Sequence, residues 1–316
     1  MSASAVDRRI RGLRPPKPKV DPFTAHGWLV EQERRPNEQN VEWALTAFLA
    51  GAECPFTCSF CDLWRWTIDG PTPAGALVRQ LEQVLAAVDG PLPDRLKLYN
   101  ASNFFDRQAV PPEDLPRIAE LARPFSAVTV ESHASTIGPQ TMEFARQIPG
   151  RLEVAIGLET VHPVAASQLN KRLDLSRFER ATDFLRENDV DLRVFVLLGA
   201  PHVERNESLD WVVRTVEYAA ARGAAVVSII PVRGGNGELE RLQGEGDFHP
   251  PTLRELEAAL DRCSHVAPTV VTADVWDAER LPACEACRSR RIARLRYLNV
   301  SGAPQAPITC AACDAA

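Results

Sequence analysis

The sequence lacks both a long apolar run and a strong positive charge. Of its 316 residues, 45% are hydrophobic and 25% are charged, which is ordinary for a soluble globular protein. No uncharged apolar stretch is long enough to span a membrane, and the basic N-terminal residues precede no apolar segment of a secretory signal. The net charge of −6 gives no sign of a broad nucleic-acid footprint, although a local basic patch is compatible with it. We therefore expect a cytoplasmic protein with no membrane partner, whose cysteines stay reduced.

Strand-like apolar runs alternate with helix-like segments along most of the chain. Each run is rich in Val, Ile and Leu and is followed by an amphipathic helical pattern, which is typical of parallel strands with crossover helices. Six such units predict an α/β fold, a partial (β/α)6 barrel, and a flat doubly wound sheet is the alternative. The predicted strands cover residues 43–51, 95–100, 127–132, 152–159, 191–199 and 225–232, with a further strand possible at 269–276.

The composition changes at both ends of this alternating region. Residues 1–40 mix Pro, Arg and Lys with little periodicity, so we expect an extended leader there. The barrel is expected over residues 41–265. Residues 266–316 form a separate segment, because they carry a four-cysteine set of their own.

Three cysteines gathered in one loop lack a fourth partner. Cys54, Cys58 and Cys61 are spaced C-x3-C-x2-C directly after the first predicted strand, at the edge of the sheet where parallel α/β proteins perform chemistry. Thiolates favour zinc or iron–sulfur clusters. A structural zinc site would have four ligands, whereas a four-iron cubane held by three cysteines leaves one iron open. The remaining alternative is zinc with a distant fourth ligand.

The spacing Cys54, Cys58, Phe60 and Cys61 resembles the C-x3-C-x-aromatic-C signature of the radical S-adenosylmethionine (SAM) superfamily. The resemblance implies a [4Fe-4S] cluster, SAM, a 5′-deoxyadenosyl radical that abstracts hydrogen from a substrate, and a reductant such as flavodoxin or ferredoxin. The stretches "EVAIGLET", "VFVLLGAP" and "SIIPVRGGNGELE" are similar to the archaeosine synthase radical partner. More distantly, they are similar to the Elongator catalytic subunit and the oxygen-independent coproporphyrinogen oxidase group. This likeness implies a modified nucleoside or tRNA base as substrate, with a small metabolite as the alternative.

The same resemblance implies which residues hold SAM. The stretch after the second strand stands where the superfamily has Gly-Gly-Glu, and acidic residues end the third and fourth strands. A helix cap or a salt bridge is the structural alternative for these acids, and Lys171 competes with Arg172 for the SAM carboxylate. The predicted contacts are Phe60, Asn100, Ala101, Ser102, Glu131, Glu159 and Arg172. Weaker candidates for substrate contacts are His133, Arg233, Asn236 and His249.

The C-terminal cysteines form two C-x2-C pairs. Cys284, Cys287, Cys310 and Cys313 suit a structural zinc ribbon or an auxiliary iron–sulfur cluster, with a redox-active dithiol as a third option. The segment between the pairs is rich in arginine, so it predicts either a phosphate-binding surface or a basic helix packed on the acidic barrel. A phosphate-binding surface in this segment is the basis of a competing hypothesis, in which the chain is a non-catalytic metal-binding module for nucleic acid.

Overall fold

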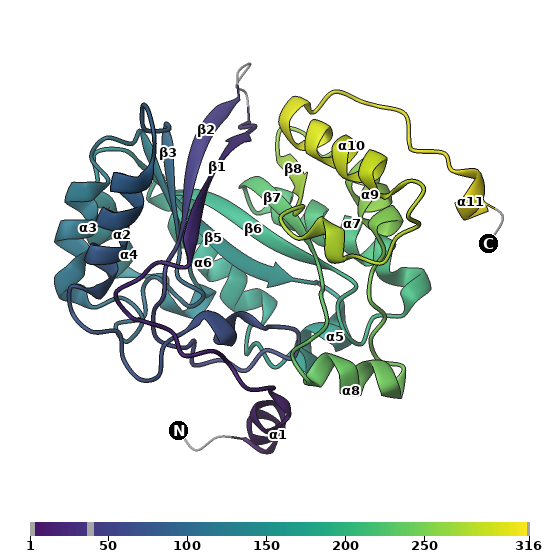
Figure 1. Cartoon of the computed structure of the whole chain (residues 1–316), viewed down its shortest axis with the longest axis horizontal. Helices are drawn as coiled ribbons and strands as arrows, with labels where there is room; N and C mark the ends of the chain where they lie inside the picture. Colours follow the sequence, from purple (N-terminus) through teal and green to yellow (C-terminus); the bar gives the residue numbers. More distant parts are fainter. Residues whose placement is uncertain (1–3, 37–40, 315–316) are drawn as a thin grey trace.

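The computed structural model describes residues 4–36 and 41–314. Its centre is one eight-stranded sheet in which the strands lie in chain order. The first pair is antiparallel and all later neighbours are parallel. The strands are β1 (Gly27–Glu33), β2 (Glu42–Phe48), β3 (Arg95–Tyr99), β4 (Ala127–Glu131), β5 (Arg151–Glu159), β6 (Asp191–Leu198), β7 (Ala224–Pro231) and β8 (Val270–Ala273). The sheet curves into a half-barrel (Figure 1), which confirms the predicted partial barrel.

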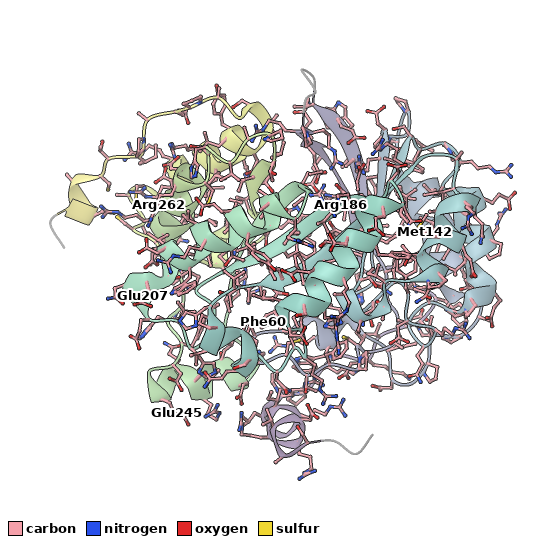
Figure 2. All side chains as sticks on the ribbon, turned by 180° about the vertical axis from the view of Figure 1, so that it is seen from behind. Phe60, Met142, Arg186, Glu207, Glu245 and Arg262 are labelled. Atoms are coloured by element: carbon pink, nitrogen blue, oxygen red, sulfur yellow. The ribbon has the colours of Figure 1, made fainter. Side chains whose placement is uncertain are left out.

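Helices cover the outer face of this sheet. Figure 1 shows α2, α3 and α4 beside the first strands and α7, α9 and α10 beside the last ones, and Figure 2 shows the same layer from behind. The helices are α1 (Ala5–Leu13), α2 (Ala76–Ala87), α3 (Leu115–Leu121), α4 (Pro139–Gln147), α5 (Pro163–Gln168), α6 (Leu175–Glu187), α7 (Ser208–Ala221), α8 (Glu238–Glu245), α9 (Leu253–Arg262), α10 (Arg288–Ser301) and α11 (Ala311–Asp314). Short 3-10 helices are η1 (Leu63–Trp66), η2 (Pro112–Asp114), η3 (Ala134–Thr136), η4 (Arg205–Glu207) and η5 (Ala278–Arg280). Among the described helices, none is both long and apolar enough to cross a membrane.

The main hydrophobic core lies between the outer face of the sheet and these helices. Leu96 and Leu98 of β3, two residues apart, are fully buried with Leu77 of α2 and Phe144 of α4. Alternate strand residues point to one face, so the apolar set of each strand meets the helices. Because β2 to β7 are each followed by a helix that covers them, the carboxyl ends of these strands remain at one common edge.

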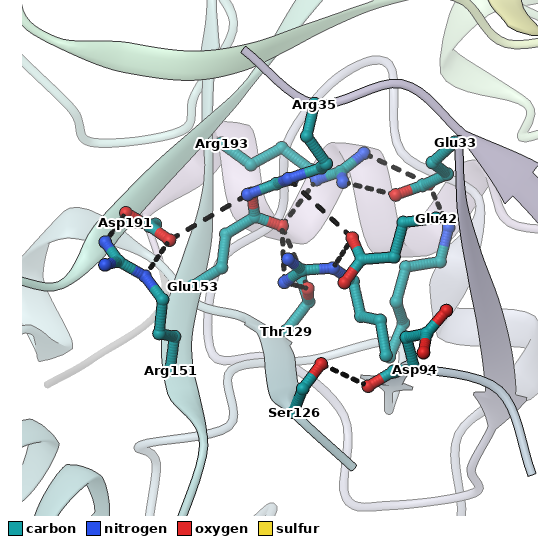
Figure 3. A network of polar contacts seen from close by, with 12 residues as sticks. Glu33, Arg35, Glu42, Asp94, Ser126, Thr129, Arg151, Glu153, Asp191 and Arg193 are labelled. Atoms are coloured by element: carbon teal, nitrogen blue, oxygen red, sulfur yellow. Dashed lines mark hydrogen bonds and ion pairs between the residues drawn. The ribbon is translucent and has the colours of Figure 1, made fainter. Parts of the chain in front are cut away.

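Charged side chains from several strands meet on the inner face of the half-barrel. Arg95 Nη1 donates to Thr129 Oγ1 (3.2 Å), Thr129 donates to Glu153 (2.8 Å), and Arg193 Nε donates to Glu153 (3.0 Å), so side chains from β3, β4, β5 and β6 meet at one level (Figure 3). β1 adds Glu33, which pairs with Arg193 at 2.7 Å. We call this set the charged layer; it comprises Glu31, Glu33, Arg35, Glu42, Arg95, Lys97, Glu153 and Arg193.

Residues 1–40, for which the sequence predicts an extended leader, contain a helix and a strand. α1 begins with a capping box between Ser4 and Asp7. β1 pairs with β2 over its whole length, because Glu31 and Glu33 find cationic partners inside the half-barrel. Both elements form ion pairs with residues that lie far away in the chain, and the local sequence pattern does not show these pairs. The domain boundaries at residues 40 and 265 stay a prediction, although the sheet draws strands from all three predicted segments.

The C-terminal segment adds a strand and a helix to the barrel. β8, the further strand that the sequence allowed, pairs with β7. The arginine-rich stretch is α10, in which Arg291 and Arg294 are buried against Glu257 of α9. Arg294 also pairs with Asp261 at 2.8 Å. These contacts match the predicted basic helix packed on the barrel.

Candidate functional site

The three-cysteine loop lies at the carboxyl edge of the sheet, directly after β2. Its backbone is fixed from two sides, because Ser59 N donates to Leu169 O (2.9 Å) and Asn236 Nδ2 donates to Ser59 O (2.9 Å) and Cys61 O (3.3 Å). Asn236 is 2% exposed and also accepts from Leu239 N at the start of α8. The loop after β7 therefore positions the cysteine loop across the opening of the half-barrel.

The three sulfurs sit in surroundings that suit a bound metal group. Burial raises the pKa of Cys54 and of Cys61, and raises the pKa of Cys58 to about 12. A positively charged metal centre deprotonates thiols that it coordinates. Asn103 Nδ2 donates to Cys54 Sγ at 3.5 Å, and such N–H contacts to ligand sulfurs help to set the potential of an iron–sulfur cluster.

One set of cysteine sulfurs in the described residues is close enough together for a single metal ion. Among the described residues, the one group of three or more candidate ligands that all lie within 4.8 Å of one another is the C-terminal four-cysteine set. The sulfurs of a tetrahedral zinc site lie roughly 3.8 Å apart, given a Zn–S bond of about 2.3 Å. The C-terminal set therefore comes close to the spacing of a single tetrahedral ion.

The loop after β3 presents polar groups beside the cysteines. The Asn100 side chain is fully buried, and neither its Nδ2 nor its Oδ1 has a hydrogen-bond partner among the described residues; the same holds for Ser102 Oγ. Asn100 Nδ2 would lie 3.8 Å from a Cβ built on Gly51, just ahead of the cysteine loop. Buried polar atoms are almost always satisfied, so these atoms fit a polar ligand such as SAM.

Glu131, at the end of β4, shapes this loop. Its Oε1 accepts from Ala101 N at 3.0 Å, and Ala101 has a φ of 54° that the contact helps to hold. Burial raises the pKa of Glu131 to about 7, against the opposing effect of the backbone N–H groups of Ala101 and Asn100. Glu131 therefore holds the conformation of the loop after β3 through this hydrogen bond, a role that the sequence did not predict.

Glu159, at the end of β5, pairs with Lys171. Lys171 Nζ lies 2.6 Å from Glu159 Oε1, and Glu159 is 4% exposed. Burial lowers the pKa of Lys171, but Glu159 and the nearby cysteines outweigh it and the net shift is upward, so the ammonium group stays charged. A Cβ on Gly157 would clash with Glu159 Oε1 and lie 2.5 Å from Lys171 Nζ, so both charged groups would have to move.

His133 links the β4 end to the cysteine loop. Its ring stacks on Phe56 with centroids 4.1 Å apart, its Nε2 lies 3.2 Å from Lys171 O, and its backbone N donates to Asn103 Oδ1. Burial, with the Lys171 cation as a second cause, lowers the pKa of His133 to about 3, so the ring is neutral. It acts as a spacer between Phe56 and Lys171.

Two predicted SAM contacts face elsewhere. Arg172 Nη2 pairs with Asp7 Oδ2 of α1 at 2.6 Å. Phe60 packs against the smaller apolar cluster, which includes Leu197 and Val232. Figure 2 shows Phe60 near the end of the molecule that carries Glu245 of α8. Both roles stay predictions. His249, the remaining weak candidate, lines a small pocket with Gly199 and Pro251, away from the cysteines.

Helix α1 lies against the cysteine loop. Asp7 accepts hydrogen bonds from Thr57 Oγ1 and from Asn170 Nδ2 (3.0 Å). Asn170 also donates to Thr57 O at 2.8 Å. Arg14 pairs with Glu53, next to Cys54, at 2.8 Å. Nothing in the N-terminal sequence predicts these contacts, although an acid three residues after Ser4 is a capping signal that could have located the helix.

The C-terminal cysteines form a compact four-sulfur site. Their Sγ atoms all lie within 4.8 Å of one another, and Cys287 Sγ is 3.6 Å from Cys313 Sγ. Each C-x2-C pair forms a tight turn, with Cys287 N donating to Cys284 O and Cys313 N to Cys310 O. Arg291 Nε donates to Cys287 Sγ at 3.2 Å. This geometry matches a single tetrahedral ion.

Comparisons with known proteins identify the fold. No family model and no curated protein matches the sequence. The structure is similar to archaeal Methanocaldococcus infernus Elp3 (TM-score 0.52, 13% identity, 71% of this chain and 58% of that one). It is also similar to a radical SAM methyltransferase from Sphaerobacter thermophilus (TM-score 0.51, 14% identity, 78% and 76%). The chain thus spans 58% of the length of that Elp3 and has the partial-barrel fold seen in radical SAM proteins.

Proposed function

We propose that the chain is a radical SAM enzyme in which Cys54, Cys58 and Cys61 hold a [4Fe-4S] cluster with one iron left open. The observation that carries the proposal is a three-sulfur loop, without a fourth sulfur, at the carboxyl edge of a partial barrel. When bound, the cluster supplies the electron and the iron site for splitting SAM to a 5′-deoxyadenosyl radical, which takes hydrogen from substrate. The charged layer links β1, β2, β3, β5 and β6 across the inner face of the half-barrel (Figure 3).

The residues around the cysteine loop have separate proposed roles in binding SAM. Asn100 and Ser102 offer buried donors and acceptors to the methionyl group of SAM, while Glu131 holds their loop in place. Glu159 is proposed to accept from the ribose hydroxyls. Arg172 and Lys171 are the two proposed partners of the SAM carboxylate. Each already pairs with a carboxylate of this chain, Arg172 with Asp7 and Lys171 with Glu159. Lys171 is the one that lies within electrostatic range of Cys58 and Cys54.

Anaerobic reconstitution with iron and sulfide tests this function. The reconstituted chain should show the broad visible absorbance of a cubane and, with dithionite, convert SAM to 5′-deoxyadenosine. Cys58→Ala should abolish both signals, because it removes a cluster ligand. Cys263→Ala is the matched control, since Cys263 is a buried core thiol of the outer layer. Unchanged SAM cleavage in Cys58→Ala would refute the cluster assignment.

We further propose that the C-terminal cysteines bind one zinc ion rather than an auxiliary cluster. The close approach of all four sulfurs supports this choice. Metal analysis of the Cys54/Cys58/Cys61→Ala triple variant should give one zinc per chain and no acid-labile sulfide. Iron with sulfide in that variant would show an auxiliary cluster instead.

The partners follow from this chemistry. A one-electron donor such as flavodoxin or ferredoxin is proposed as reductant, in the cytoplasm, where eight unpaired thiols stay reduced. The competing nucleic-acid module is less well supported. Of the five α10 arginines, Arg288, Arg291, Arg294 and Arg296 pair with carboxylates of this chain. A modified nucleoside or tRNA base remains the proposed substrate family.

A further inference from the structure

Aromatic side chains form a floor above the charged layer. Tyr99 of β3 and Phe195 of β6 have ring centroids 6.3 Å apart, although two strands separate them in the sheet, so they meet across the lumen. Trp276, after β8, contacts Phe48 of β2 at 5.1 Å and Tyr99 at 6.2 Å. It therefore bridges the gap between the first and last parallel strands. We call Phe48, Tyr99, Phe195 and Trp276 the aromatic floor.

The aromatic floor is fixed in position yet partly open. Trp276 Nε1 donates to Glu31 Oε2 at 3.1 Å, and Trp276 N donates to Asp274 Oδ1 at 3.0 Å. The Lys97 ammonium lies 5.6 Å from the Trp276 ring centroid. Trp276 nevertheless remains 42% exposed. A rigid, partly exposed aromatic surface inside a lumen is suited to stacking a planar ring.

Arg233 presents a free binding edge next to this floor. Its Nη1 pairs with Asp274 Oδ2 at 3.0 Å, and Asp274 is the same residue that holds the Trp276 backbone. Its Nε and Nη2 are buried, and no group among the described residues accepts from either. These two nitrogens form the side of the guanidinium that binds a carboxylate or phosphate through two parallel hydrogen bonds.

Arg65, on η1 after the cysteine loop, reaches toward the same place. Its Nη2 and Nη1 would lie 3.8 and 3.9 Å from a Cβ on Gly235, two residues after Arg233. Its Nε is buried without an acceptor in the described part of the chain. Asp62 lies within electrostatic range of both arginines. No ion pair joins Asp62 to either arginine among the described residues, so both keep donors free.

We propose that the substrate is a planar conjugated molecule with a carboxylate or phosphate arm. Its ring stacks on the aromatic floor, and its anionic oxygens occupy the Nε and Nη2 edge of Arg233, with Arg65 beside them. This assignment rests on the proposed function in naming the substrate of that site.

Calorimetric titration of the full-length reconstituted protein with three probes tests the proposal. 2-Naphthoate and 2-naphthyl phosphate carry the two anion types, and 2-naphthamide has the same ring without charge. At least one anion should bind about tenfold or more tightly than the amide, because charge-assisted bonds to Arg233 are lost with the amide. Arg233→Gln, which keeps a donor for Asp274, and Arg65→Gln should each remove that preference. Arg262→Gln, on the outer surface of α9, should retain it.

Three outcomes would overturn the proposal. The amide binds as well as both anions, or the preference survives in both arginine variants, or none of the probes binds at its solubility limit. When the titration is repeated with saturating SAM, the preference for the anionic probes should remain. If SAM abolishes this preference, the Arg233 edge binds SAM and not the substrate. The titration is read without SAM cleavage, so chains that fail to form 5′-deoxyadenosine still report on this site separately.

Discussion

Among single residues, unusual backbone angles gather around the cysteine loop. Six described non-glycine residues have positive φ, and four of them contact this loop or its neighbours: Ala101 (54°), Glu159 (71°), Asn170 (54°) and Arg172 (58°). Each such position costs on the order of 1–3 kcal/mol and persists only when surrounding contacts hold it. Strain of this kind concentrates at functional sites, and here it aims side chains at one edge of the sheet.

Gly157→Ala should disrupt the Lys171–Glu159 pair. The new Cβ cannot coexist with the present positions of both charged groups, so the ion pair must move. We expect a loss of about 1–3 kcal/mol in the free energy of unfolding by urea, and a matching fall in SAM cleavage. Gly244→Ala in exposed α8 is the control, because nothing lies within 4 Å of a Cβ there. Equal free energies of unfolding and equal SAM cleavage in the two variants would contradict this prediction.

Glu131 should make stability fall as pH rises toward neutrality. Its pKa is raised to about 7 from an ordinary value of 4.5, so between these values the folded state holds a proton that the unfolded state has released. Stability contributed by protonated Glu131 is therefore complete below pH 4.5 and is lost as pH rises through about 7. Urea titrations at several pH values measure how the free energy of unfolding changes with pH. Glu131→Gln should reduce this pH dependence, whereas Glu143→Gln, at an exposed position, should leave it unchanged. A slope that is unchanged in Glu131→Gln would show that the carboxyl is not buried as described.

At the scale of elements, α1 acts as a brace for the cysteine loop. One carboxylate, Asp7, receives hydrogen bonds from Thr57 in the loop, from Asn170 and from Arg172. Figure 1 shows α1, α5 and α8 gathered at the same end of the half-barrel. The loop proposed to hold the cluster benefits from such support, since its own backbone makes only a few hydrogen bonds.

Asp7→Ala should loosen the cysteine loop without removing a ligand. It leaves the donors of Thr57, Asn170 and Arg172 without their carboxylate, which costs about 1–3 kcal/mol of stability. Iron should be lost faster from the reconstituted variant when a chelator is added, as followed by visible absorbance. Arg11→Ala, an exposed change on the same helix, serves as the control. Identical rates of iron loss would rule out the bracing role.

The six parallel strands β2 to β7 and the helices that follow them were predicted from the sequence, but β1 and α1 were not. Periods of two and 3.6 residues report apolar burial, so the patterns at 95–100 and 191–199 correctly predicted β3 and β6. β1 and α1 are held by ion pairs whose partners lie far away in the chain, such as Lys97 with Glu31 and Arg172 with Asp7. For the same reason, spacing located the cysteines but could not show that Lys171 reaches Glu159.

At the scale of the molecule, the charged layer holds β1 to the rest of the barrel. Glu153 is fully buried and accepts from Arg35 (2.6 Å), Arg193 (3.0 Å) and Thr129 (2.8 Å). Burial alone would raise its pKa, but Arg193, Arg35 and Arg95 hold the pKa well below its ordinary value. Such a network fixes one arrangement of the half-barrel, because every member depends on the others.

Glu153→Gln should destabilise the whole chain. Removing one charge from a buried network leaves the arginines uncompensated, which costs about 3–5 kcal/mol. Thermal and urea unfolding should both report the loss, and the exposed change Glu187→Gln should cause little effect. A loss below about 1 kcal/mol, the size typical of a surface ion pair, would mean that the layer is solvated rather than buried.

The central claim is that three sulfurs leave one iron of a cubane free for SAM. Mössbauer spectroscopy of protein reconstituted with Mössbauer-active iron, recorded before and after SAM addition, tests it directly. We predict a [4Fe-4S] spectrum in which SAM changes the signal of a single iron and leaves the others unaltered. A cluster that does not respond to SAM, or iron bound only as isolated ions, would contradict the claim.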